Sequence, residues 1–167
     1  MSTLKLVYGP DPIFRKHADM VTVYDAALSK TLQDMADTLY FHNALGIGAN
    51  MLGILQRLVV VDLQEDKKKQ LYKMVNPEII NKSSNKVEMI EASLSFPGIK
   101  AKIERPEHIE VVYYDEAGAK IELAATGLLA RVIQHEVDYL NGITFLDYLS
   151  PVKRKILLSK IKKNRRG

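Results

Sequence analysis

The stretch GLLARVIQHEVDYLNG, residues Gly127–Gly142, decides the fold of this chain. Apolar residues recur along it at helical spacing and predict one buried stripe on an α-helix. The stripe consists of Leu129, Val132, Ile133, Val137 and Leu140. Thr126 is the expected N-cap, and Asn141 followed by glycine is a typical helix end. The stretch therefore predicts a central helix from which the rest of the fold can be worked outward.

Two polar residues of this helix, His135 and Tyr139, are four positions apart and share a face. In the pattern His-Glu-x-x-His, two imidazoles bind one metal ion and the glutamate acts as general base or acid. Here a tyrosine stands in the fifth position. Glu136 falls inside the apolar stripe, where an unpaired carboxylate is costly. Two interpretations stay open: a structural carboxyl bonded to backbone or a tyrosine hydroxyl, and a catalytic carboxyl facing a cleft.

The remaining sequence predicts a mixture of helices and strands around this helix. Because these elements do not alternate regularly, the expected class is α+β, with antiparallel sheets, and not doubly wound α/β. We expect a helix capped by Asp25 through about Tyr40, an irregular glycine-containing segment at 45–55, a strand at 57–63, a strand at 71–75 ended by Asn76-Pro77, a hairpin at 108–123, and a helix starting at Ser150-Pro151.

Length and composition restrict the class of protein. The 167 residues, 47% hydrophobic and 26% charged, indicate a single domain spanning 1–167. There is no cysteine, which excludes disulfides and thiolate sites. No apolar run is long enough for a transmembrane helix, and the N-terminus has no signal-peptide pattern, so we expect a cytoplasmic protein with no membrane partner.

The C-terminal stretch 152–167 is expected to form a basic helix. No Asp or Glu follows Asp147, whereas the remaining 16 Lys and Arg residues of the chain face 20 Asp and Glu. The cations of the stretch are Lys153, Arg154, Lys155, Lys160, Lys162, Lys163, Arg165 and Arg166. Such a stretch is either a solvated helix face or a surface for a polyanion, of which RNA is the natural choice.

Three blocks of the sequence resemble the motifs of the peptide deformylase family. Gly127–Gly142 is similar to its motif His-Glu-x-x-Asp-His, Glu91–Gly98 (EASLSFPG) to Glu-Gly-Cys-Leu-Ser, and Gly46–Arg57 (GIGANMLGILQR) to Gly-x-Gly-Leu-Ala-Ala-x-Gln. The likeness extends to Asp11-Pro12 near the start and to Leu146–Pro151 near the end. The resemblance implies the deformylase fold over nearly the whole chain.

The resemblance also implies a reaction and its site. The family removes formyl from the N-terminal formyl-methionine of nascent polypeptides, with Fe²⁺, Zn²⁺ or Ni²⁺ held by one cysteine and two histidines. By position, His135 matches one ligand, while Ser93 and Tyr139 replace the other two. Glu136 matches the catalytic glutamate, and Asp138 an aspartate that supports the site from outside.

The first motif is shortened by two residues, which places Met51 at the position of the glutamine that stabilises the oxyanion. Leu94 keeps the position whose backbone N–H faces the oxyanion. Gly46, Ile47 and Gly48 fall where the family has its substrate pocket. A lost oxyanion donor typically costs about 10²–10³ in rate.

These replacements favour a deformylase-like protein that keeps the fold as a binding module and has lost the catalytic activity. Serine does not ionise near pH 7, and tyrosine ordinarily has a pKa near 10, so neither is a good metal ligand. We therefore expect no cofactor, and as partners the ribosome or its RNA and nascent peptide N-termini. Two enzymatic alternatives remain: residual metal-dependent deformylation, and hydrolysis with Ser93 as nucleophile and His135 as base. We also expect Glu136 to lie in a polar network with the former ligand positions.

Overall fold

The computed structural model describes the backbone of residues 2–166 and the side chains of residues 2–161. A five-stranded antiparallel sheet has the strand order β1-β2-β3-β6-β7. Its strands are β1 (Gly46–Gly48), β2 (Leu58–Val61), β3 (Tyr72–Lys82), β6 (His108–Tyr114) and β7 (Lys120–Thr126). A separate antiparallel hairpin consists of β4 (Lys86–Ser93) and β5 (Phe96–Pro106). The three α-helices are α1 (Ala26–Phe41), α2 (Gly127–Leu140) and α3 (Pro151–Arg166). The α+β class with antiparallel sheets is confirmed.

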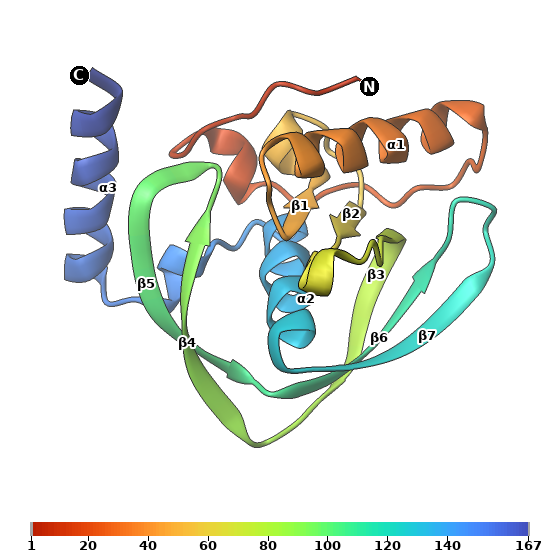
Figure 1. Cartoon of the computed structure of the whole chain (residues 1–167). Helices are drawn as coiled ribbons and strands as arrows, with labels where there is room; N and C mark the ends of the chain where they lie inside the picture. Colours follow the sequence, from red (N-terminus) through yellow and green to blue (C-terminus); the bar gives the residue numbers. More distant parts are fainter. Residues whose placement is uncertain (1, 167) are drawn as a thin grey trace.

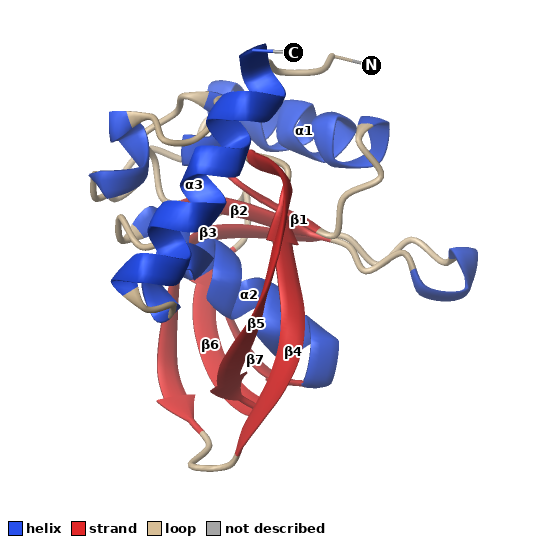
Figure 2. Ribbon diagram, turned by 90° about the vertical axis from the view of Figure 1, so that its left-hand side faces the viewer, coloured by secondary structure: helices blue, strands red, loops and turns tan. Residues whose placement is uncertain are grey.

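The central helix α2 lies between the two sheets, with the β4–β5 hairpin on one side and β6–β7 on the other (Figures 1 and 2). The predicted stripe is only part of its buried surface. Ile133, Val137 and Leu140 are buried as expected, whereas Leu129 and Val132 are half-buried. Buried residues continue around the helix beyond this stripe, and are Ala130, Arg131, Gln134, His135, Glu136 and Tyr139. The helix therefore holds its polar side chains inside the protein.

The helix α1 follows from its sequence as expected. The Asp25 side chain accepts a hydrogen bond from the Leu28 N–H at 2.9 Å, which satisfies one of the free N–H groups of the first turn. The apolar face is fully buried against the core, and consists of Leu28, Leu32, Met35 and Leu39. Because α1 ends at Phe41, directly before β1, it brings the loop 42–45 to the entrance of the pocket described below.

One prediction about a strand was wrong, and one pair of strands was missed. Asn76-Pro77 does not end the second strand, because β3 continues to Lys82 with a register shift between Val75 and Glu78. At this shift Asn76 adopts φ 52°. Its Oδ1 accepts from the Val21 N–H and its Nδ2 donates to the Val21 carbonyl, which holds the irregular backbone in place. The β4–β5 hairpin was not expected at all. The irregular segment 45–55 contains β1 and a short 3₁₀-helix, Ala49–Leu52.

The basic helix α3 begins at Pro151, where the Ser150 hydroxyl accepts from the Lys153 N–H. It runs beside β5 (Figure 1). Its apolar face holds it there, since Ile161 is fully buried and Leu157 and Leu158 pack against the core. Lys153, Lys155 and Lys160 are exposed, whereas Arg154 pairs with Asp147 at 3.2 Å. Four more cations predicted for the basic face lie outside the residues whose side chains the structure describes: Lys162, Lys163, Arg165 and Arg166. No helix in residues 2–166 combines the length and apolarity needed to cross a membrane.

Candidate functional site

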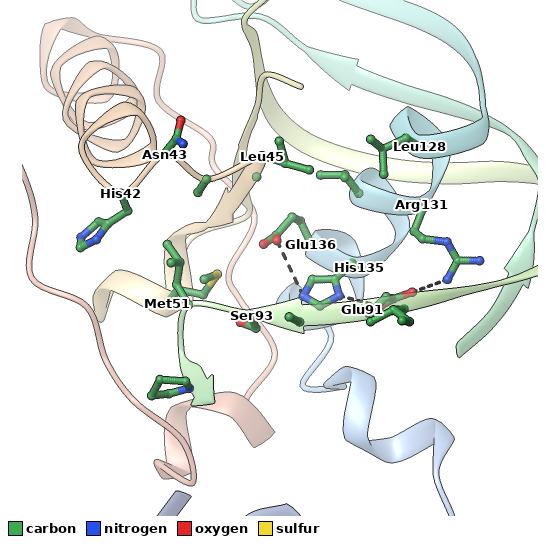
Figure 3. Close-up of a pocket in the computed structure, with 17 residues that line it drawn as sticks. His42, Asn43, Leu45, Met51, Glu91, Ser93, Leu128, Arg131, His135 and Glu136 are labelled. Carbon is green, nitrogen blue, oxygen red and sulfur yellow. Dashed lines mark hydrogen bonds and ion pairs between the residues drawn. The ribbon is translucent and has the colours of Figure 1, made fainter. Parts of the chain in front are cut away.

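A pocket of about 470 Å³ opens where α1, β1, β4 and α2 meet (Figure 3). Its apolar walls come from β4, α2, the short 3₁₀-helix and the loops beside them: Leu45, Met51, Ile90, Leu94, Leu128 and Val132. Its polar side chains are His42, Asn43, Glu91, Ser93, Arg131, His135 and Glu136. Most positions predicted from the sequence therefore lie around one cavity, which is apolar at its walls and polar at its base. Concave sites of this composition bind small molecules or peptide ends.

Glu91, on β4, is the hub of the base of the pocket. Its carboxylate accepts from Arg105 Nε at 2.5 Å and from Arg131 Nη1 at 2.5 Å. It also lies 2.7 Å from His135 Nδ1. Burial favours the neutral acid, but the hydrogen bonds from His135 and Arg105 win and lower the pKa of Glu91 to about 2. Glu91 is therefore ionised, and the ring nitrogen facing it must carry the proton.

A second carboxylate extends this cluster outward. Asp138 accepts from Arg105 Nη1 at 2.8 Å and from the Tyr148 hydroxyl at 2.6 Å. The Arg105 guanidinium also lies over the Tyr148 ring, 4.7 Å from its centroid. Asp138 thus supports Arg105, which in turn supports Glu91 and, through it, the orientation of His135.

Glu136 is buried beside the pocket, with 4% of its surface exposed. Its Oε1 lies 3.9 Å from His135 Nε2, and its Oε2 has no hydrogen-bond partner among the residues described. Burial raises the pKa of Glu136 to about 7. The close approach of β1 depends on glycine: a methyl group on Gly46 would lie 2.6 Å from Val132 Cγ1, and one on Gly48 3.3 Å from Glu136 Oε2.

Tyr139 turns its ring into an aromatic cluster with Phe14 and His135, at centroid distances of 5.6 and 5.0 Å. Its hydroxyl is buried and faces Ser93, but within the described part of the chain it meets no partner at hydrogen-bond geometry. Burial raises the pKa of Tyr139 well above its ordinary value. The predicted network is therefore incomplete, because neither Glu136 Oε2 nor the Tyr139 hydroxyl has the expected bond.

The two positions assigned to oxyanion stabilisation differ in what they offer. Met51 is buried, and its sulfur accepts from the Gly48 N–H at 3.4 Å, so it supplies no donor. Leu94 is half-buried and lines the pocket. Of the three residues expected in the substrate pocket, Gly46 lines it, Ile47 is fully buried in the core, and Gly48 contacts Glu136 instead.

The residues matched by resemblance to the ligand positions of the family, Ser93 and Tyr139, do not suit a divalent metal ion. A phenol with a raised pKa stays protonated, and a protonated phenol is a poor ligand for Zn²⁺ or Fe²⁺. The Ser93 hydroxyl is likewise neutral at physiological pH. His135 Nε2 alone keeps the character of a good ligand.

Sequence reasoning missed the residues that orient His135. Glu91 is an acid that could orient His135 as the base of a serine nucleophile. Among the described residues, however, the Ser93 hydroxyl accepts from the Ser95 N–H and makes no hydrogen bond with His135. Arg105 and Arg131 were missed as well. For Arg131 the sequence held one signal: it is a charged residue next to apolar positions on α2, which indicates a buried partner.

Comparisons with known proteins agree with this geometry. The family model for polypeptide deformylase matches residues 3–155. A peptide deformylase-like protein of Rickettsia conorii is 48% identical over 96% of this chain and 87% of its own length. The peptide deformylase of Thermodesulfovibrio yellowstonii is 37% identical, over 97% of this chain and 98% of its own length. A crystal structure of peptide deformylase from Ehrlichia chaffeensis in complex with actinonin is 36% identical, with a TM-score of 0.95 and full coverage of both chains. The chain belongs to the polypeptide deformylase family.

Proposed function

We propose that this chain binds the N-terminal segment of peptides in its pocket and does not deformylate them. The observation that carries this proposal is the donor set at the former metal position. By resemblance, Ser93 stands at the position of the family's cysteine ligand and Tyr139 at the position of one histidine ligand. The Tyr139 hydroxyl is buried and its pKa is raised. A structural zinc site with four ligands contributes roughly 10–16 kcal/mol, so the loss of two ligands removes several kcal/mol of metal affinity.

The walls of the pocket suit an extended peptide. β1 is an edge strand of the larger sheet, and within residues 2–166 it pairs with β2 alone, while β4 pairs with β5 alone. Both strands lie beside the pocket, to which Gly46 and Ile90 contribute. An extended chain can add to a free strand edge through main-chain hydrogen bonds, with alternate side chains in adjacent pockets. The apolar lining favours a first residue with a hydrophobic side chain.

The position in the cell is part of the same proposal. The exposed Lys153, Lys155 and Lys160 on α3 form a cationic face that suits ribosomal RNA, since phosphate contacts dominate such binding. A cytoplasmic protein docked in this way would meet nascent N-termini directly. Arg154 is a weaker candidate, because Asp147 neutralises it.

A second candidate is metal-dependent deformylation at a low rate. His135 and Glu136 favour it, because both match the residues that the family has at these positions. The pKa of Glu136, raised to about 7, suits a general base or acid. The missing donor at Met51 and the unfit ligand set argue against it.

Three measurements on the purified full chain separate the two functions. Elemental analysis gives the bound metal, a formate-release assay on formyl-Met-Ala-Ser gives turnover, and calorimetry gives peptide binding. We expect less than stoichiometric metal, no formate above background, and saturable peptide binding. Stoichiometric Fe, Ni or Zn together with formate release would establish the enzyme instead.

A further inference from the structure

The larger sheet ends in a free strand edge at β7 (Lys120–Thr126). This strand pairs with β6 and meets no other strand within residues 2–166 (Figure 1). It is the edge opposite to β1, and none of its residues lines the pocket described above. An exposed strand edge is a template for pairing with another chain, and natural proteins often block it with a proline or a bulge. β7 contains no proline, and its pairing with β6 shows no register shift.

The backbone groups that face this free edge follow from the bonds that β7 makes on its other side. A hydrogen bond at each end of the strand, at Ala119 and at Gly127, shows which residues bond toward β6. Bonded residues alternate along an antiparallel pair, so Ile121 and every second residue after it bond to β6. The N–H and C=O groups of Lys120 and Glu122 therefore point away from the sheet.

The side chains along the edge differ between its two faces. Ile121 and Leu123 are half-buried and pack against the core cluster on the side of α2. Lys120 and Glu122 are exposed on the other face, and within residues 2–161 neither has a salt-bridge partner. Ala124 is exposed as well, and its methyl group is too small to block the approach of another strand. The edge thus carries partly uncovered apolar surface on one face and one unpaired charge of each sign on the other.

We propose that β7 pairs antiparallel with β7 of a second copy of this chain, about a two-fold axis at Ile121. In this register Lys120 lies opposite Glu122 of the partner subunit, and the same pair recurs on the other side of the axis. Each pair exchanges two backbone hydrogen bonds. The two Ile121 side chains meet in the non-hydrogen-bonded pair between them, where side chains lie closest. The contact is closed, because the same strand serves both copies.

The charges of β7 select both this register and this partner. An axis at Leu123 would place the two Glu122 side chains diagonally next to each other, and an axis at Glu122 would place them directly opposite, where like charges destabilise. A strand of another protein fits only if it carries opposite charges in the same alternation. β7 itself does so when it is turned antiparallel, because Lys120 and Glu122 then exchange places. Exposed ion pairs of this kind add little affinity and mainly fix the register.

Sedimentation equilibrium of the full chain tests the dimer. The average mass should rise with protein concentration from 18.9 kDa toward twice that value. Lys120→Glu places like charges opposite each other in both pairs and should weaken dimerisation at least about 5-fold, whereas adding Glu122→Lys should restore it to within about 2-fold of the wild type. Lys100→Glu makes the same charge change at an exposed position of β5 and should have no effect.

Two results of this experiment would overturn the proposal. A chain that stays monomeric at every concentration would leave the edge free or reserve it for a strand of another protein. A double variant that dimerises as weakly as Lys120→Glu alone would show that Lys120 and Glu122 do not face each other across the axis.

Single cysteines locate the axis, since the chain has no cysteine of its own. The Cα atoms of a non-hydrogen-bonded pair lie about 4.5 Å apart, within the range of about 4.4–6.8 Å that a disulfide accepts. Under mild oxidation Ile121→Cys should therefore give a covalent dimer on a non-reducing gel. Leu123→Cys, which faces Ala119 of the partner subunit, should stay monomeric. Absence of the Ile121→Cys dimer, or an equal yield from Leu123→Cys, would reject the axis and with it the proposal.

Discussion

Glu136→Gln should stabilise the protein at high pH and leave its stability nearly unchanged at low pH. In the folded protein, burial raises the pKa of Glu136 from an ordinary 4.5 to about 7. Because the folded pKa lies above the unfolded one, the contribution of this carboxyl to stability is complete below pH 4.5 and is lost as the pH rises through about 7. A change of this size corresponds to about 3 kcal/mol at pH 8. Glutamine has no proton to lose, so its variant escapes this cost.

Urea unfolding followed by far-UV circular dichroism at pH 4.5, 6, 7 and 8 measures the effect, and it suits a chain without tryptophan. The difference in unfolding free energy between variant and wild type should grow from near zero at pH 4.5 to about 3 kcal/mol at pH 8. The exposed Glu122→Gln should follow the wild type at every pH. Parallel curves for wild type and Glu136→Gln across this range would refute the assignment of a buried, strained carboxyl.

Three further predictions concern the former ligand positions and the basic helix. The double change Ser93→Cys with Tyr139→His should restore tight Zn²⁺ binding by elemental analysis but little formate release; rapid turnover would show that the missing donor at Met51 does not limit the reaction. Tyr139→Phe removes a buried hydroxyl without a partner within the described region, so the melting temperature should rise, by about 2–4 °C for a gain of 1 kcal/mol; a fall would reveal a bond to Ser93. Replacing Lys153, Lys155 and Lys160 by glutamine should weaken ribosome co-sedimentation and flatten its salt dependence, which an unchanged profile would contradict.

The helices were predicted well because their signals are local. The Asp25 side chain caps α1 and the Ser150 side chain caps α3, and each bonds an N–H only three residues further along the chain. The apolar spacing of α1 likewise repeats every three or four residues. The β4–β5 hairpin was not predicted, because most residues of β4 (Lys86–Ser93) are exposed and do not alternate between buried and exposed. The path of β3 through Asn76 depends on bonds to Val21, which is 55 residues away in the chain. No local pattern predicts a contact of that separation.

The site residues were predicted from the family resemblance, one position at a time. Such a prediction names the positions but not the contacts between them. Motif positions placed His135, Glu136 and Ser93 at one pocket. They could not show that Glu91 lies 44 residues from His135 in sequence and yet 2.7 Å from its ring. Nor could they show which hydroxyls lack a partner, because that depends on how the Tyr139 ring packs against Phe14. Packing of this kind is decided by the whole core and not by one segment.

The ionic cluster around Glu91 has a consequence for how such a protein changes over generations. It joins β4, β5 and α2 through Arg105, Arg131 and His135, without using Ser93 or Tyr139. Removing one member of a buried ion cluster typically costs about 3–5 kcal/mol, so the integrity of the scaffold depends on these residues. Ser93 takes no part in this cluster, and Tyr139 contacts His135 through its ring alone. The hydroxyl groups that face the pocket can therefore be exchanged without breaking the ion pairs that join its walls.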